Sequence, residues 1–174
     1  MMKWALIIIG VLAGIVVLIT IIGALLPRDH VASTSASIPA VPEDVWDAIT
    51  DVAAAPEWRD LKSVEVLSTP GKPLRWREVS RFGPITLEQE EAIPNKKFVG
   101  RIADTDQGFG GTWTYEIEPI ANGSRVTITE RGFVTNPLFR FMSRFVFGYY
   151  GTQESYLRAL GKKFGEEVMV VRQT

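Results

Sequence analysis

Three glutamates and one tyrosine occupy positions from which they could act on a bound molecule. Glu78, Glu91, Glu130 and Tyr115 each lie in a stretch where apolar and polar residues alternate, on the same side as apolar neighbours. Residues two apart in a strand point to the same face. A carboxylate inside an apolar pocket can abstract a proton from a carbon beside a carbonyl group, while a tyrosine or an arginine stabilises the oxyanion. These four residues are the candidate catalytic groups.

The same carboxylates have a structural interpretation. Burying a carboxylate is costly unless it is paired or hydrated, so inward-facing Glu78, Gln89 and Glu91 would require water, a ligand or a cationic partner inside. A β-bulge that reverses the alternation would instead place Glu78 or Glu91 at the rim, bridged to Arg75, Arg77 or Arg101. The sequence leaves both arrangements open.

Apolar residues with a large proportion of aromatic rings occupy the predicted inner faces. Such side chains can line a ligand cavity, but most aromatic residues on inner faces are simply part of a core. The candidate ligand-binding residues on the strands and on a C-terminal helix are Trp76, Phe82, Leu87, Phe109, Trp113, Tyr115, Phe141 and Phe145.

The composition excludes several kinds of site. The chain has no cysteine, which rules out disulfides, thiolate metal sites and cysteine nucleophiles. Its one histidine, His30, lies within a few residues of a predicted membrane boundary, which argues against a serine hydrolase triad or a histidine metal site. We therefore expect no metal and no cofactor. The net charge of -1 argues against a nucleic-acid partner.

The elements that must position these residues begin with a strand and two short helices. Weak alternation from Val31 to Ile38 predicts a strand, and Pro42 opens a helix whose apolar residues have helical spacing. A second short helix or turn is expected from Asp51 to Trp58, stopped near Pro56.

Strands in meander order should follow, each paired with its neighbour. A strand beginning at Val64 is followed by strands expected at 74–82, 85–93, 97–103, 110–117 and 125–133. Asn122-Gly123 is a strong hairpin signal before the last of them. Asn122-Gly123-Ser124 also matches a glycosylation sequon, but the turn is a sufficient explanation.

One long helix should close the chain. Asn136 suits a helix cap and Pro137 the first helical position, and helical character continues toward Val171. Four glycines weaken this helix and could bend it: Gly148, Gly151, Gly161 and Gly165. The fold class is therefore α+β, with an antiparallel sheet wrapped around a long C-terminal helix.

The N-terminal run from Trp4 to Leu26 contains no charged residue. As a helix it covers roughly 35 Å, against a hydrocarbon core of about 30 Å. A cleaved signal peptide is the alternative, but its apolar region is usually only about 7 to 15 residues long. We predict a single-pass anchor over residues 1–27 and one domain over 28–174. Lys3 weakly favours a domain on the extracytoplasmic side.

Residues 137–150 are apolar on nearly every side of the expected helix. Such a helix must contact something besides its own core. It could lie in the lipid headgroup region, with Arg140 and Arg144 reaching toward phosphates. A homodimer contact or burial under a loop would also cover it, and the oligomeric state stays undetermined.

The order of these elements resembles the helix-grip fold of the START-like (SRPBCC) superfamily, in particular its polyketide cyclase/dehydrase and lipid-transport-like branch. The resemblance covers the whole domain, and short segments in matching order carry it: Ile38-Pro39-Ala40, Val45 to Asp51, Pro56-Glu57-Trp58-Arg59, Gly110-Gly111-Thr112-Trp113, Thr129-Glu130-Arg131-Gly132, Asn136-Pro137 and Tyr156-Leu157. It implies a hydrophobic cavity between the sheet and the long helix, and an apolar ligand. The anchor departs from soluble members and favours a lipid-related ligand.

Two functions of different class follow. The first is a membrane-tethered binding protein for a lipid, isoprenoid or quinone-like molecule, which would enter between the long helix and the loops at 82–85 or 104–110. The second is a cyclase or dehydratase that uses an inner carboxylate as general base. Binding is favoured over catalysis because the sequence shows no catalytic signature beyond these carboxylates, which a bulge could place at the rim. A scaffold with a fully packed interior is a third alternative.

Overall fold

The structure, a computed structural model, describes residues 2–104 and 107–173. Most of this chain forms one antiparallel sheet of eight strands in the order β2-β3-β4-β5-β6-β7-β1-β8. The meander from β2 to β7 confirms the predicted pairing of neighbours, and β1 completes the sheet beside β7. The strands are β1 Asp29–Ile38, β2 Ser63–Val66, β3 Arg75–Ser80, β4 Gly83–Ile93, β5 Lys97–Ile102, β6 Phe109–Ile120, β7 Gly123–Val134 and β8 Val171–Gln173.

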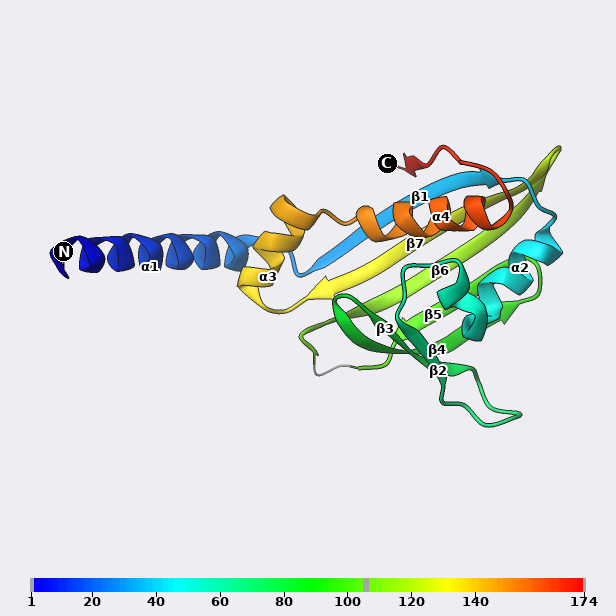
Figure 1. The fold of residues 1–174 in the computed structure, drawn as a ribbon, viewed down its shortest axis with the longest axis horizontal. Helices are drawn as coiled ribbons and strands as arrows, with labels where there is room; N and C mark the ends of the chain where they lie inside the picture. The colour runs from blue at the N-terminus through cyan, green and yellow to red at the C-terminus, as the bar shows by residue number, and fades with distance from the viewer. Residues whose placement is uncertain (1, 105–106, 174) are drawn as a thin grey trace.

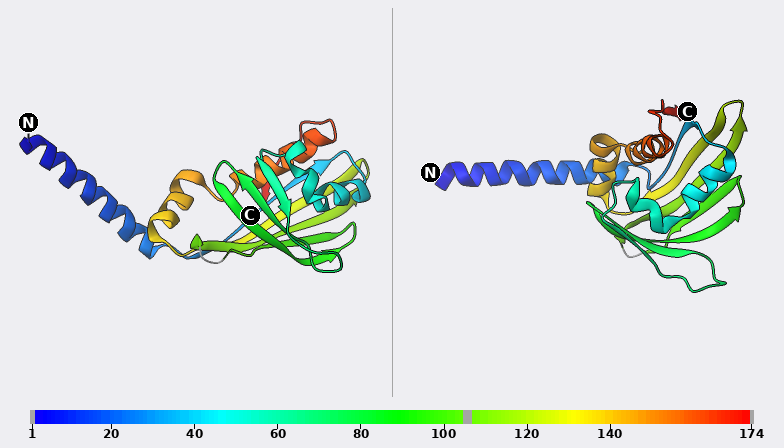
Figure 2. Two further views of the ribbon diagram at one scale, coloured as in Figure 1. Left: turned by 60° about the horizontal axis from the view of Figure 1, so that its bottom comes forward. Right: turned by 45° about the vertical axis from the view of Figure 1, so that its right-hand side comes forward.

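The helices lie on one side of this curved sheet or extend away from it. Helix α1 (Met2–Leu25) projects from the domain, whereas α2 (Pro42–Thr50) and α4 (Gly151–Lys163) cover the concave face (Figures 1 and 2). A 3₁₀ turn at Val52–Glu57 follows α2, as the predicted second short helix. The described chain thus has the α+β helix-grip arrangement that the sequence predicts.

The β6–β7 hairpin forms where Asn122-Gly123 predicts it. Ile120 pairs with Gly123, so Ala121 and Asn122 make the turn itself. Gly123 has a φ of 127°, and a side chain there would meet the Ile38 carbonyl at 2.1 Å. Glycine is therefore required both for the backbone conformation and for the close approach of β1.

The C-terminal helix predicted as one element is broken into two. Helix α3 (Pro137–Met142) continues as a π-helical turn at Ser143–Phe147, and α4 begins only at Gly151. The break lies at Gly148, whose φ of 71° no right-handed helix contains. Helix α4 then ends before Gly165, at φ 85°, and β8 follows where helix was expected. The glycines thus bend and end the helix.

Helix α4 is fixed to the sheet by both apolar and polar contacts. Leu157 and Leu160 are completely buried in the core. Gln153 is buried as well: its amide nitrogen donates to the Ala32 carbonyl at 3.0 Å, and its oxygen accepts from the Thr34 hydroxyl at 3.0 Å. Every polar atom of this buried side chain therefore has a partner in β1, which fixes where α4 lies.

Helix α1 contributes little to the core of the domain. Over Leu6–Leu25 it is long and apolar enough to cross a membrane, and only 6% of that span is buried. Its contact with the domain is at its C-terminal end, against α3 (Figure 1). A side chain at Gly23 would meet the Pro137 carbonyl at 1.9 Å, so the two helices touch through their backbones.

Candidate functional site

A partly buried ion pair lies between the sheet and α4, with about a fifth or less of each side chain exposed. Arg59 follows the 3₁₀ turn, and its two terminal nitrogens donate to the two oxygens of Glu78 in β3, at 2.8 and 2.9 Å. The Trp76 indole donates to one of these oxygens at 3.1 Å. The inward Glu78 thus has the cationic partner that its burial requires. This bidentate geometry is the strongest form of arginine–carboxylate pairing.

Two tyrosines adjoin the ion pair. Tyr115 in β6 and Tyr156 in α4 have ring centroids 5.2 Å apart, and the Arg59 guanidinium lies 4.7 Å from the centre of the Tyr156 ring. Burial raises the pKa of both tyrosine hydroxyls well above the usual range. Both therefore stay protonated, and because the two hydroxyls hydrogen-bond to each other, one of them remains to donate to an oxygen atom of a ligand.

Arg59 keeps its charge despite its surroundings. Burial, the largest single effect, lowers the pKa of the guanidinium, but the charge and hydrogen bonds of Glu78 together with the neighbouring tyrosines outweigh it and raise the pKa above its usual range. The interior thus contains a permanent cation, a carboxylate with both oxygens occupied, and two hydroxyl donors. Such a set can bind an oxygen atom of a ligand, while Arg59 and Trp76 already occupy three of the roughly four acceptor sites of the Glu78 carboxylate.

The cavity around these groups is small. It has a volume of about 20 Å³, enough for one water molecule rather than a lipid. It is closed by aliphatic and aromatic side chains together with the ion pair and the tyrosines: Ile49, Val52, Ala55, Trp58, Arg59, Trp76, Glu78, Phe98, Tyr115 and Tyr156.

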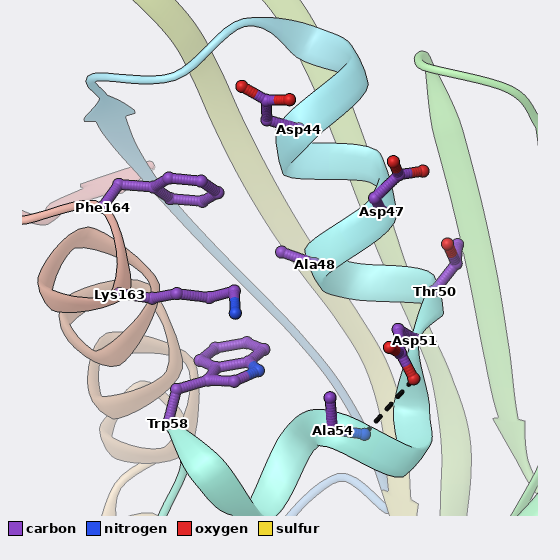
Figure 3. Close-up of a pocket in the computed structure, with 9 residues that line it drawn as sticks. All are labelled: Asp44, Asp47, Ala48, Thr50, Asp51, Ala54, Trp58, Lys163 and Phe164. Atoms are coloured by element: carbon purple, nitrogen blue, oxygen red, sulfur yellow. Dashed lines mark hydrogen bonds between the residues drawn. The ribbon is translucent and has the colours of Figure 1, made fainter.

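A larger groove lies on the other side of Trp58. It is an open depression of about 670 Å³ between α2 and the C-terminal end of α4 (Figure 3). Trp58 lines both the groove and the inner cavity, so its indole ring is part of the wall between them. Its indole nitrogen is buried and has no hydrogen-bond partner among the described residues. The rest of the groove is lined by Asp44, Asp47, Ala48, Thr50, Asp51, Ala54, Lys163 and Phe164.

Several predicted ligand-binding residues lie where the sequence places them, on the concave face. Trp76 is buried, and Leu87, Trp113 and Tyr115 pack against the core. Phe109 is half-buried at the start of β6. Trp76, Leu87, Trp113 and Tyr115 lie around the ion pair or its neighbours, whereas Phe109 lies at the far end of β6, opposite Val134.

Phe82, Phe141 and Phe145 do not face this interior, and here the expectation needs correction. Strand β3 ends at Ser80, and Phe82 belongs to the two-residue turn before Gly83, so the alternation stops before it; its side chain is 81% exposed. The break at Gly148 carries Phe141 and Phe145 away from the sheet toward α1. Their rings pack against each other in a tilted arrangement, with centroids 4.9 Å apart.

Glu91 also lies outside the interior. A bulge between Gln89 and Glu91 shifts the register of β4, so the second half of the strand turns its side chains over. Glu91 then pairs with Lys97 at 2.6 Å, with its side chain 42% exposed. The outward-turning bulge that the sequence left open therefore occurs at Glu91 and not at Glu78. The partner of Glu91 is Lys97 and not one of the expected arginines.

Glu130 shares the face of the buried Val126 and Ile128 but lies far across the sheet. Its carboxylate is 3.3 Å from the His30 imidazole nitrogen, and the His30 ring stacks on Tyr149 at 4.0 Å. Strands β4, β5 and β6 separate it from Glu78. The three candidate bases therefore do not converge on one point.

Sequence reasoning missed the roles of Arg59, Tyr156 and Trp58. Arg59 and Trp58 follow a short turn with no periodic pattern, so alternation could not assign them a direction. From the sequence, Tyr156 is singled out only in the Tyr156-Leu157 segment of the family resemblance, without a role of its own. The inward Glu78 was the available signal, because a buried carboxylate requires a cation nearby.

Comparison with known proteins places the chain in a family. Residues 29–162 match the family model described as polyketide cyclase / dehydrase and lipid transport, and the chain belongs to that family. No curated protein matches its sequence.

Solved structures share the fold at low identity. The Zhui aromatase/cyclase from a Streptomyces species has a TM-score of 0.62 at 12% identity, covering 78% of this chain and 93% of that one. A START superfamily protein from Mycobacterium smegmatis has a TM-score of 0.59 at 14% identity, covering 79% and 97%. Protein MLL2253 from Mesorhizobium loti has a TM-score of 0.57 at 18% identity, covering 78% and 95%.

Proposed function

We propose that this member of the family is a membrane-tethered binding protein for an apolar small molecule with an oxygen-bearing end, such as a lipid, an isoprenoid or a quinone-like compound. Helix α1 would be the tether, with the domain weakly expected on the extracytoplasmic side. The observation that carries the proposal is the cluster of Arg59, Tyr115 and Tyr156 in an aromatic interior. Its donors suit an oxygen atom, and its walls suit an apolar body.

The ligand would reach the interior from the groove between α2 and α4, and not beside the loops at 82–85 or 104–110 that the sequence suggested, the second of which includes residues 105–106 outside the described chain. Ligand pockets typically have volumes of about 300 to 1,000 Å³, far above the inner cavity and similar to the groove. Because Trp58 is a shared wall, rotation of its side chain would join the two spaces. Its unpartnered indole nitrogen gives up no hydrogen bond when the ring moves.

The test is native mass spectrometry of the full chain in detergent micelles, followed by organic extraction. We expect an apolar molecule to be released in near-stoichiometric amount. Trp58→Ala should speed its exchange with added membrane lipid extract, while Phe82→Ala, at an exposed turn, should leave exchange unchanged. A protein that stays free of ligand after exposure to the extract would overturn the proposal and favour a scaffold.

A cyclase or dehydratase is the second candidate, favoured by the position of Glu78 inside the fold. Its weakness is that both Glu78 oxygens already accept hydrogen bonds from Arg59. Under the enzyme hypothesis, Glu78→Gln should retain binding and abolish conversion of the extracted compound. Under the binding hypothesis, no conversion occurs in the unmodified protein.

A further inference from the structure

An exposed apolar segment lies beside the end of α1. We call residues 137–147, which are α3 and the π-helical turn, the elbow. Five of its large apolar side chains are exposed, Phe147 the most at 66%; the others are Leu138, Phe139, Phe145 and Val146. A cluster of this size on one short segment is unusual for a surface in water and marks a contact site.

The elbow is fixed to α1 by two contacts. Gly23 and Pro137 touch through their backbones. The buried Arg140 side chain donates from one nitrogen to the Leu26 carbonyl at 2.8 Å and from another to the Thr135 carbonyl at 3.2 Å. The C-terminal end of a helix carries a partial negative charge, which a cation stabilises. Arg140 therefore caps α1 rather than reaching toward phosphates, as its sequence position suggested.

These contacts determine where the elbow would lie relative to a bilayer. The Leu6–Leu25 span of 20 residues has a length of roughly 30 Å, the thickness of the hydrocarbon core, so its last turn would lie at the core boundary. The elbow packs crosswise against that last turn in all views (Figures 1 and 2). Its exposed aromatic residues thus belong to a segment that packs beside the exposed apolar helix α1.

We infer that the elbow is embedded in the lipid headgroup region, where it holds the domain at a fixed orientation on the membrane. Aromatic side chains are favoured at this depth, and Arg144, which is exposed on the same turn, can reach lipid phosphates. Arg28 is exposed just after α1 and adds a second cation at the same level. The inference rests on the proposed role of α1 as a membrane tether.

Single cysteine substitutions provide the test, because the chain has no native cysteine. The full chain is reconstituted in vesicles of phosphatidylcholine and phosphatidylglycerol, and a spin label is attached at Phe145→Cys or Phe147→Cys. Collision with oxygen, which concentrates in lipid, is compared with collision with a water-soluble nickel chelate. We expect both elbow labels to favour oxygen over the chelate.

Two control labels separate this inference from the tether itself. Val11→Cys, in the middle of α1, should show the strongest preference for oxygen, and Thr69→Cys, in the β2–β3 turn at the opposite end of the domain, should show none. If the elbow labels collided mainly with the chelate while the label at position 11 collided mainly with oxygen, the elbow inference would be overturned and the proposed tether would stand. Aqueous labels at Val11 as well would overturn both.

A homodimer contact would give a different result. Elbow labels would then be shielded from both reagents and would broaden each other's spectra in undiluted protein. Dilution with unlabelled chain would remove the broadening, and that outcome would overturn the lipid assignment.

Discussion

The interior beneath α4 and the junction between α1 and α3 each contain one arginine, partly buried in the first and buried in the second, and each holds its charge in a different way. Arg59 is neutralised by the Glu78 carboxylate and surrounded by aromatic rings. Arg140 is buried against backbone carbonyls, and none of the described carboxylates pairs with it. The first arrangement creates a polar centre beside a small interior cavity. The second fixes the direction of one helix relative to another.

The difference shows what each charge requires from its surroundings. A buried ion pair loses the stabilising effect of hydration, which only excellent geometry and further hydrogen bonds offset. Arg140 instead stabilises the partial negative charge at the end of α1, where several carbonyls lack partners within the helix. Substitutions in the two regions should therefore have different consequences.

The largest effect is expected from breaking the interior pair. Glu78→Gln leaves the largely covered Arg59 charge without a counterion and should lower the free energy of unfolding by about 3 to 4 kcal/mol, near the lower end of the cost for a fully buried pair. Denaturant unfolding of the full chain in micelles, followed by tryptophan fluorescence, measures this loss. The double variant Arg59→Met/Glu78→Leu should recover most of it. If Glu78→Gln alone were as stable as the unmodified protein, water would be solvating the Arg59 charge and the pair would contribute little to stability.

Loss of the contact between α4 and β1 should come next. Gln153→Ala leaves the buried Thr34 hydroxyl and Ala32 carbonyl without their partner, at a cost of about 3 kcal/mol. The same unfolding measurement applies, with the exposed Arg158→Ala on α4 as control. Equal effects of the two substitutions would mean that water replaces the amide.

A substitution at the junction between α1 and α3 should lower the free energy of unfolding less than the two above, but it should make the orientation of α1 relative to the domain more variable. Arg140→Met removes two hydrogen bonds from a charged donor, worth about 2 kcal/mol in total, while keeping the apolar packing. Spin labels at Val11→Cys and Thr69→Cys should show a broader distance distribution in this variant. Arg144→Met, at an exposed position on the adjoining turn, is the control and should leave the distance distribution unchanged. If it broadened the distribution as much as Arg140→Met, contact with lipid rather than the Arg140 hydrogen bonds would fix the orientation of α1.

The smallest effect concerns the edge strand β8 and depends on pH. A hydrogen bond from Arg172 lowers the pKa of Glu154. A lowered folded-state pKa contributes stability above the ordinary glutamate value and loses it as the pH falls through the folded value. Glu154→Gln should therefore be slightly less stable at neutral pH and match the unmodified protein in acid. A difference that persists in acid would point to a packing effect.

Local patterns in the sequence determined much of this protein. The 23-residue apolar run, the alternation of the strands and the turn residues depend on near neighbours, so they predict α1, the meander and the β6–β7 hairpin. The absence of cysteine also follows directly from the sequence. Even the glycines that divide the C-terminal helix were visible, although their consequence was not.

Only the tertiary structure decided which charged groups meet. Arg59 contacts Glu78 across a turn and a strand, and Arg140 binds the carbonyl of a residue 114 positions away. The bulge in β4 turned Glu91 outward, and the break at Gly148 moved Phe141 and Phe145 from the predicted cavity to the elbow. Such contacts depend on how distant segments pack, because a single extra strand residue or a single left-handed glycine redirects every side chain beyond it.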